Sequence, residues 1–90
     1  MIITNFTLDG TTYMLKQPLE LQPQFKEGYC ELIDEHLGIY IVAPTEEQLQ
    51  TDYESTLAMM FSIYAGSMDF ELNDTSLKVK NKLLEMVDCP

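Results

Sequence analysis

Apolar and polar residues alternate along much of the first 43 positions, which is the pattern of β-strands with one buried face. The β-rich runs Ile2–Leu8 and Thr11–Lys16 flank Asp9-Gly10, a dipeptide typical of a two-residue hairpin turn. Pairing across this turn puts Leu8 opposite Thr11, Phe6 opposite Tyr13 and Thr4 opposite Leu15. One face of the predicted hairpin 2–16 is then apolar and consists of Ile2, Phe6, Leu8, Tyr13 and Leu15. We expect that face to rest on a helix.

Three further antiparallel strands are expected between residues 18 and 43. The first alternates apolar and polar residues over 18–25, although Pro23 cannot donate to a ladder and so favours an edge position or a bulge. Two compact turns separate the strands 29–33 and 37–43, and these turns are Lys26-Glu27-Gly28 and Asp34-Glu35-His36. The pattern leaves open whether the hairpin 2–16 joins the sheet formed by this meander.

A helix from residue 45 to residue 65 is well marked at both ends. Thr45 can cap the third helical amide, Glu46 and Glu47 favour the positive end of the helix dipole, and Gly66 is a stop signal. Helical spacing aligns a single apolar stripe, which consists of Leu49, Tyr53, Leu57, Met60, Phe61 and Tyr64. Such a stripe predicts that the helix covers a sheet.

A second helix is predicted over residues 75–87, with Asn73 or Asp74 as its cap. Its apolar side consists of Leu77, Leu83, Leu84 and Val87. Met59 and Ile63 lie off the stripe of the first helix, and we expect them to pack against the second. The connector between the helices favours a short strand through Met68, Phe70 and Leu72. The fold class is therefore α+β, with an antiparallel sheet (N-terminal hairpin plus three-stranded meander) packed by helices 45–65 and 75–87 in one domain, 1–90.

Charge narrows the function classes. The 15 Asp and Glu residues outnumber the 5 Lys residues, and the formal net charge is −10. Surfaces that bind nucleic acid need clustered Lys and Arg, so direct nucleic-acid binding is not expected. From Glu27 to Asp74 the chain has eleven acidic residues and no Lys or Arg. This stretch favours a basic protein as the partner.

No segment indicates membrane insertion or secretion. The start lacks the basic region and apolar core of a signal peptide, and the longest apolar stretch, Leu57–Ala65, is much shorter than the roughly 20 residues that span a bilayer. Cys30 and Cys89 are too few for a disulfide framework, so we expect reduced thiols. These signs predict a cytoplasmic protein. A chain of this length gains stability from a partner surface or from a homodimer.

Patterns typical of catalysis or metal binding are weak. His36 is the only histidine and lies in a predicted turn, where an exposed side chain is the ordinary state. The close Cys or His pairs of zinc sites are missing, as are a phosphate-binding loop and a nucleophile elbow. Glu31, Asp34 and Glu35 could hold magnesium in a hydrolase centre, but strand ends and a turn predict solvent-facing side chains there. We expect no catalytic residue, no metal and no cofactor.

Three segments carry a resemblance to a known family. They open the second and third strands of the meander and start the first helix, and they read Gly28-Tyr29-Cys30-Glu31, Leu37-Gly38-Ile39 and Ala43-Pro44-Thr45-Glu46-Glu47-Gln48-Leu49. In this order they resemble the HicB-like antitoxin domain, in which a D-G-G-Y turn, a P-G-C or L-G-I strand and a T-x-E-E-A helix follow one another. The start of the second helix, Leu72-Asn73-Asp74-Thr75-Ser76-Leu77, is similar to stand-alone members of that family.

The resemblance implies a partial ribonuclease-H-like α+β domain that lacks the metal carboxylates of the nuclease. It also implies a non-catalytic protein that binds and occludes a small basic ribonuclease toxin, with dimerisation. Only Asp-Cys-Pro follows Val87, so we expect the stand-alone form without a DNA-binding extension.

The predicted partner-binding residues are exposed acids at strand ends and at the helix start, namely Glu31, Asp34, Glu35, Glu46 and Glu47. Two alternatives to the antitoxin hypothesis stay open. One is an orphan structural or scaffolding domain of the same fold in an unrelated complex. The other is a metal-dependent hydrolase centred on Glu31, Asp34 and Glu35.

Overall fold

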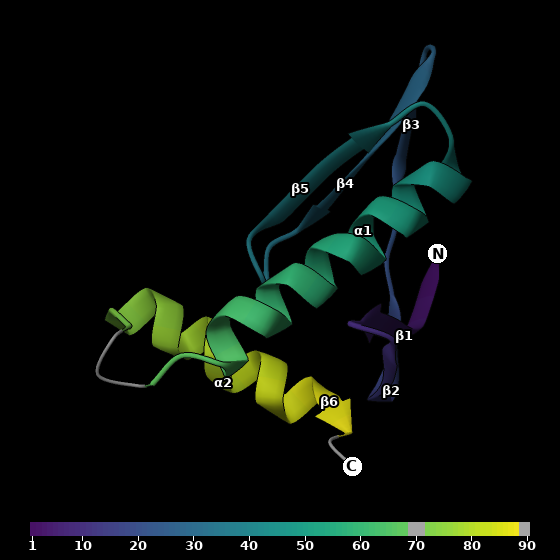
Figure 1. Ribbon diagram of the computed structural model, residues 1–90. Coiled ribbons are helices and arrows are strands. Elements are labelled where there is room, and N and C mark those ends of the chain that lie inside the picture. The colour runs from purple at the N-terminus through teal and green to yellow at the C-terminus, as the bar shows by residue number, and fades with distance from the viewer. Residues whose placement is uncertain (69–71, 89–90) are drawn as a thin grey trace.

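The computed structural model describes residues 1–68 and 72–88 (Figure 1). The architecture is α+β, as the sequence predicts. Two antiparallel three-stranded sheets contact one long helix, and a second helix packs near the C-terminal end of the first. The molecule is elongated, with extents of 44 × 27 × 21 Å along its principal axes.

The first sheet has the strand order β1–β2–β6. Its strands are β1 (Ile2–Leu8), β2 (Thr11–Glu20) and β6 (Val87–Asp88). Asp9 and Gly10 both have positive φ, 50° and 79°, which is the backbone conformation of a type I′ hairpin turn. The turn predicted from the sequence is therefore confirmed.

The hairpin register follows the prediction next to the turn and shifts before it reaches Ile3. Beyond the shift Ile3 pairs with Leu19, so the predicted pair of Thr4 with Leu15 does not form. Ile3 is buried and Ile2 is 54% exposed, which reverses the predicted assignment of Ile2 to the apolar face. The reversal coincides with the register shift between Ile3 and Asn5, where the alternation of buried and exposed residues along β1 is interrupted.

The second sheet, of order β3–β4–β5, is the predicted meander. Its strands are β3 (Gln24–Lys26), β4 (Tyr29–Asp34) and β5 (Ile39–Ala43). β3 is short and begins just after Pro23, while residues 19 and 20, expected in this strand, extend β2 instead. The hairpin does not join the meander, so the question that the sequence left open is settled in favour of two separate sheets.

Helix α1 (Glu46–Met60) begins where the sequence predicts, because Thr45 Oγ1 accepts a 3.1 Å hydrogen bond from the backbone amide of Gln48. It continues as a π-helical turn, η1 (Phe61–Ala65), and ends at Gly66. The buried residues of the predicted stripe are Leu49, Tyr53, Leu57 and Phe61. α1 contacts β1 on one side and β4 and β5 on another, so it connects the two sheets.

Helix α2 (Asp74–Met86) is capped by Asn73, whose side chain accepts a 2.8 Å hydrogen bond from the amide of Ser76. Leu83 and Val87 are its fully buried apolar residues. Val87 ends the helix and begins β6, which pairs with β2. The sequence does not predict this strand, since two residues are too few to show alternation.

Of two expectations for the helix connection, one is wrong and the other concerns residues outside the described part of the chain. Met59 and Ile63 are each 55% exposed, so the prediction that they pack against the second helix is wrong. The strand predicted through Met68, Phe70 and Leu72 involves residues 69–71, which lie outside the described residues.

One connected hydrophobic core fills the space where α1 meets both sheets and α2. Its largest fully buried side chains are Tyr53, Phe6, Ile3, Leu32, Leu49, Leu57, Leu83 and Val87. Over residues 1–68 and 72–88, no helix is both long enough and apolar enough to cross a membrane.

Candidate functional site

The second sheet has one face on α1 and the opposite face open. Strand alternation turns one set of residues toward the helix, and the buried members of this set are Cys30, Leu32, Asp34, Ile39 and Ala43. The other set faces away from α1 and consists of Tyr29, Glu31, Ile33, Tyr40 and Val42. We call this second set the open face.

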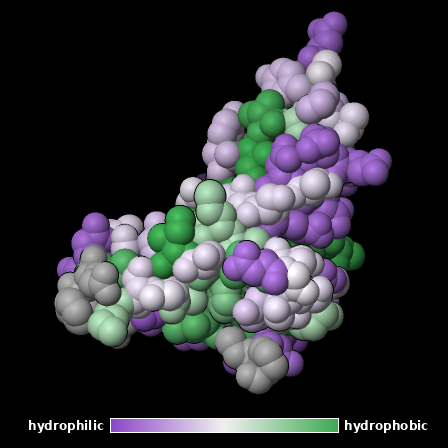
Figure 2. All heavy atoms as spheres, viewed as in Figure 1, coloured by the Kyte–Doolittle hydropathy of each residue, from purple (hydrophilic) through white to green (hydrophobic). Residues whose placement is uncertain are grey.

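Four large apolar side chains lie on the open face. Tyr29 is 43% exposed, Ile33 55%, Tyr40 61% and Val42 47%, because no element of the described chain covers them. Figure 2 shows hydrophobic atoms along the part of the molecule that the second sheet occupies, next to the hydrophilic atoms of the α1 start. Single apolar residues are normal on a surface, whereas neighbouring ones mark a binding surface.

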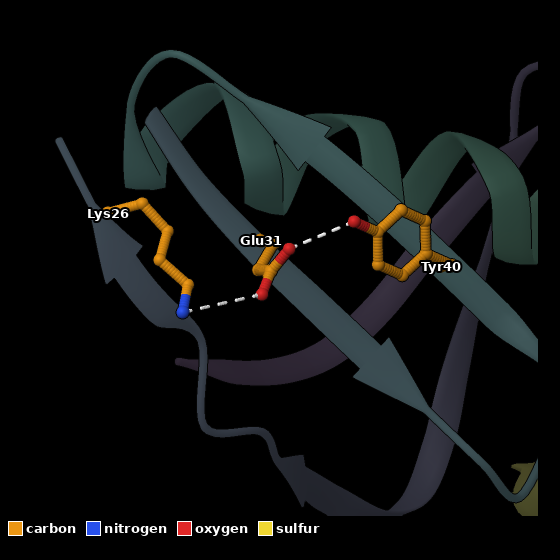
Figure 3. A network of polar contacts seen from close by, with 3 residues as sticks. All are labelled: Lys26, Glu31 and Tyr40. Atoms are coloured by element: carbon orange, nitrogen blue, oxygen red, sulfur yellow. Dashed lines mark hydrogen bonds and ion pairs between the residues drawn. The ribbon is translucent and has the colours of Figure 1, made fainter. Parts of the chain in front are cut away.

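A polar contact crosses the middle of the open face (Figure 3). Tyr40 Oη donates a 2.9 Å hydrogen bond to Glu31 Oε2, and Lys26 Nζ lies 3.9 Å from Glu31 Oε1. The Glu31 side chain is only 16% exposed. The hydrogen bond to Glu31 raises the pKa of Tyr40 above its ordinary value. One carboxylate therefore links β3, β4 and β5 on their outer side.

The five acids predicted to bind a partner lie in four settings. Glu31 sits on the open face, as described above. Glu35 is exposed in the turn before β5, and Glu46 and Glu47 are exposed at the start of α1, just after β5. Asp34 is buried at 9% exposure on the α1 side, so the expectation of an exposed side chain there is wrong. The structure thus places three exposed acids at the two ends of β5.

Asp34 is buried because it accepts two hydrogen bonds beneath the sheet. Tyr53 Oη, from α1, donates to Asp34 Oδ2 at 2.7 Å, and the backbone amide of His36 donates to Asp34 Oδ1 at 3.0 Å. A buried carboxylate is stable only when it has such donors. These contacts hold the β4–β5 turn against α1, while the side chain of His36 itself is exposed, as predicted.

The raised pKa of Tyr53 should make the stability of the fold depend on pH in the alkaline range. Burial, and then the hydrogen bond to Asp34, raise the pKa of Tyr53 far above its ordinary value near 10. Above about pH 10 the unfolded chain loses this proton and the folded chain keeps it, so the folded state binds more protons. The contribution of Tyr53 to stability is therefore complete below about pH 10, and we expect it to fall by up to about 1.4 kcal/mol per pH unit above that point.

Urea unfolding of the wild type and of Tyr53→Phe, measured between about pH 9 and about pH 11, checks this expectation. The wild type should lose stability more steeply than the variant, because the two proteins differ only in the hydroxyl of Tyr53 and both retain Tyr40. Equal slopes for the two proteins would contradict the assigned role of the Tyr53 hydroxyl.

The three carboxylates of the hydrolase alternative do not converge. Glu31 and Asp34 are three positions apart on β4, so they lie on opposite faces of the sheet, and both oxygens of Asp34 accept protein hydrogen bonds. Glu35 is exposed in the turn beyond them. Among the residues that the structure describes, no group of three or more His, Cys, Asp or Glu side chains could hold a metal ion.

A cavity of about 460 Å³ lies beside the β4–β5 turn. Lys82 of α2 donates a 2.9 Å hydrogen bond to the backbone oxygen of His36 at its rim. The apolar part of its wall consists of Leu19, Leu21, Leu37 and Met86. Because the wall combines three segments that are distant in sequence, periodicity alone could not indicate it.

The apolar residues of the open face were not among the predicted partner-binding residues, all of which were acidic. A signal was present, since both Tyr29–Asp34 and Ile39–Ala43 are apolar at several consecutive positions. A strand with only one buried face needs apolar residues at alternate positions alone. The excess apolar residues of these two strands therefore mark a face that another molecule can cover.

Comparisons of the chain with protein-family models, with curated proteins and with solved structures give no match.

Proposed function

We propose that this chain is a non-catalytic protein-interaction module that binds a small basic protein on the open face of the second sheet. The observation that carries the proposal is the uncovered face itself, where Tyr29, Ile33, Tyr40 and Val42 are each between 43% and 61% exposed. Interface centres are rich in tyrosine and apolar residues and are surrounded by polar rims. The open face has this composition, with a single paired carboxylate, Glu31, near its centre.

Charge supports a basic partner. Exposed acids lie at both ends of β5, and the only lysine of the second sheet, Lys26, is already paired with Glu31. A negative rim accelerates encounter with a positively charged protein and discriminates against acidic ones. The apolar centre would then supply most of the affinity, because its side chains lose water on binding.

The resemblance to the HicB-like antitoxin domain suggests what this basic protein is. Three antiparallel strands followed by a helix, with a Gly-Tyr strand start and a Thr45 cap, are the features on which that resemblance rests. We propose on this basis that the partner is a small ribonuclease toxin, that binding neutralises it, and that the pair occurs in the cytoplasm, where Cys30 stays a free thiol.

Capture of the tagged full chain from native lysate, followed by mass spectrometry, tests this function. The expected result is a stoichiometric partner that is small and basic and whose ribonuclease activity is lost in the complex. A stoichiometric partner that is not a basic ribonuclease would contradict the antitoxin assignment and favour a scaffolding domain of the same fold.

The double variant Ile33→Thr, Val42→Thr is expected to weaken binding of that partner at least about tenfold, because it removes apolar area from the centre of the interface. Both positions are exposed, so folding should be retained. The matched control is Met59→Gln, Ile63→Gln, which removes similarly exposed apolar side chains from the helical segment 46–65. Isothermal titration with the captured partner measures both. Equal loss in the two variants would contradict a site on the open face.

A further inference from the structure

The outer edge of β5 is chemically open to another strand. The five residues Ile39–Ala43 contain no charge, no proline and no glycine, and they pair with β4 in a register without interruption. Among the described residues no strand pairs with the other side of β5. Natural edge strands are usually blunted by charge, proline, a bulge or a covering element, since an unblunted edge recruits other strands.

The edge strands β3 and β1 each have a feature that hinders pairing with a further strand. β3 has only three residues and includes Lys26. β1 has an irregular register, and Gln50 of α1 donates a 3.4 Å hydrogen bond to the backbone oxygen of Ile2.

The acidic residues near both ends of β5 favour a basic partner over a second copy of the chain as the molecule that pairs with this edge. Antiparallel pairing of β5 with β5 of a second copy, centred on Ile41, would place the turn that carries Glu35 of one copy on the same side as the helix start that carries Glu46 and Glu47 of the other. Like charges across such a pair are destabilising. An extended segment with Lys or Arg at both ends would instead meet opposite charge at Glu35 on one side and at Glu46 and Glu47 on the other. The homodimer implied by the family resemblance would then use another surface.

We propose that the basic partner adds a strand to β5, so that the second sheet becomes four-stranded in the complex. This inference rests on the proposed function and specifies its binding mode. Main-chain hydrogen bonds of the added strand would supply affinity, and its outward side chains would lie beside Tyr40 and Val42 on the open face. The segment is therefore about five residues long, apolar or β-branched at alternate positions, with basic residues at both ends.

A synthetic nonapeptide with alternating valine and threonine between pairs of lysine is the probe for this mode, with the unmodified full chain as receptor. Two N-methylated forms keep its side chains and charge. One is methylated at alternate residues and keeps one free hydrogen-bonding edge, and the other is methylated at every central residue and has none. We expect the unmethylated peptide and the alternately methylated peptide to bind. The fully methylated peptide should bind at least about tenfold more weakly than these two.

Fluorescence anisotropy measures the affinities, and amide hydrogen exchange should slow within Ile39–Ala43 only with the peptides that bind. A peptide with glutamate in place of lysine should not bind, because the ends of β5 are acidic. Strand addition is overturned if all three basic peptides bind equally, or if none binds. Either result leaves the capture experiment and the Ile33→Thr, Val42→Thr variant to decide separately whether a basic protein binds the open face at all.

Discussion

Replacing Asp34 by alanine is expected to lower the free energy of unfolding by about 3 kcal/mol. The substitution removes the acceptor of two hydrogen bonds and leaves the hydroxyl of Tyr53, a residue with no exposed surface, without its partner. A domain of this size has only about 5–15 kcal/mol of stability in total, so the loss is a large fraction. Urea unfolding followed by circular dichroism near neutral pH measures it.

Three companion variants separate the hydrogen bonds from the loss of volume. Asp34→Asn keeps a carbonyl acceptor and should lose less stability than Asp34→Ala. Tyr53→Phe removes only the donor, and the double variant with Asp34→Ala completes a cycle in which we expect a coupling free energy of about 1–2 kcal/mol. Glu35→Ala is the surface control, since Glu35 is exposed one residue further on. If Asp34→Ala were as mild as Glu35→Ala, the buried contact would carry no stability.

The hydrogen bond between Tyr53 and Asp34 also bears on the proposed function. It connects α1, which lies behind the second sheet, to the turn that leads into the edge strand β5. It lies where β4 turns into β5, and through Tyr53 it attaches that turn to α1. Loss of the contact should therefore disturb the position of β5 before it disturbs the first sheet. A binding defect in Asp34→Ala would be indirect, because Asp34 itself is buried and cannot contact a partner.

Local signals predicted the helices and turns well. The first helical segment begins after the predicted cap, Thr45, and ends at the predicted stop, Gly66. The Asp9-Gly10 turn has the predicted conformation. Each of these features depends on a few consecutive residues and on backbone geometry that those residues favour. Asn73, offered with Asp74 as the cap of the second helix, is the one that the structure selects.

Features that depend on distant segments could not be predicted. The register shift between Ile3 and Asn5, the division into two sheets and the pairing of β6 with β2 all follow from how separate parts of the chain pack together. Asp34 shows the same limit at the candidate site. Its neighbours in sequence are typical of an exposed turn, and only the arrival of Tyr53 from α1 makes burial of the carboxylate favourable.

Phe6→Ala is expected to lower the free energy of unfolding by about 3–5 kcal/mol. Phe6 is 1% exposed, and its ring centroid lies 5.5 Å from that of Tyr13 and 5.4 Å from that of Phe61. Truncation would remove the ring contacts and leave a cavity between the first sheet and η1. The remaining stability would be small for a domain of this size.

Phe25→Ala is the matched control for this experiment, since the same group is removed from a side chain that is 66% exposed, and its cost should be well below 1 kcal/mol. Phe6→Leu should recover part of the loss, because it refills most of the volume without restoring the ring contacts. Chemical unfolding followed by far-ultraviolet circular dichroism and by tyrosine fluorescence measures all three variants. The two signals should change together, because Phe6 and Tyr53 belong to one connected core. Equal stabilities of Phe6→Ala and Phe25→Ala would show that the aromatic group of Phe6, Tyr13 and Phe61 does not hold the first sheet to η1.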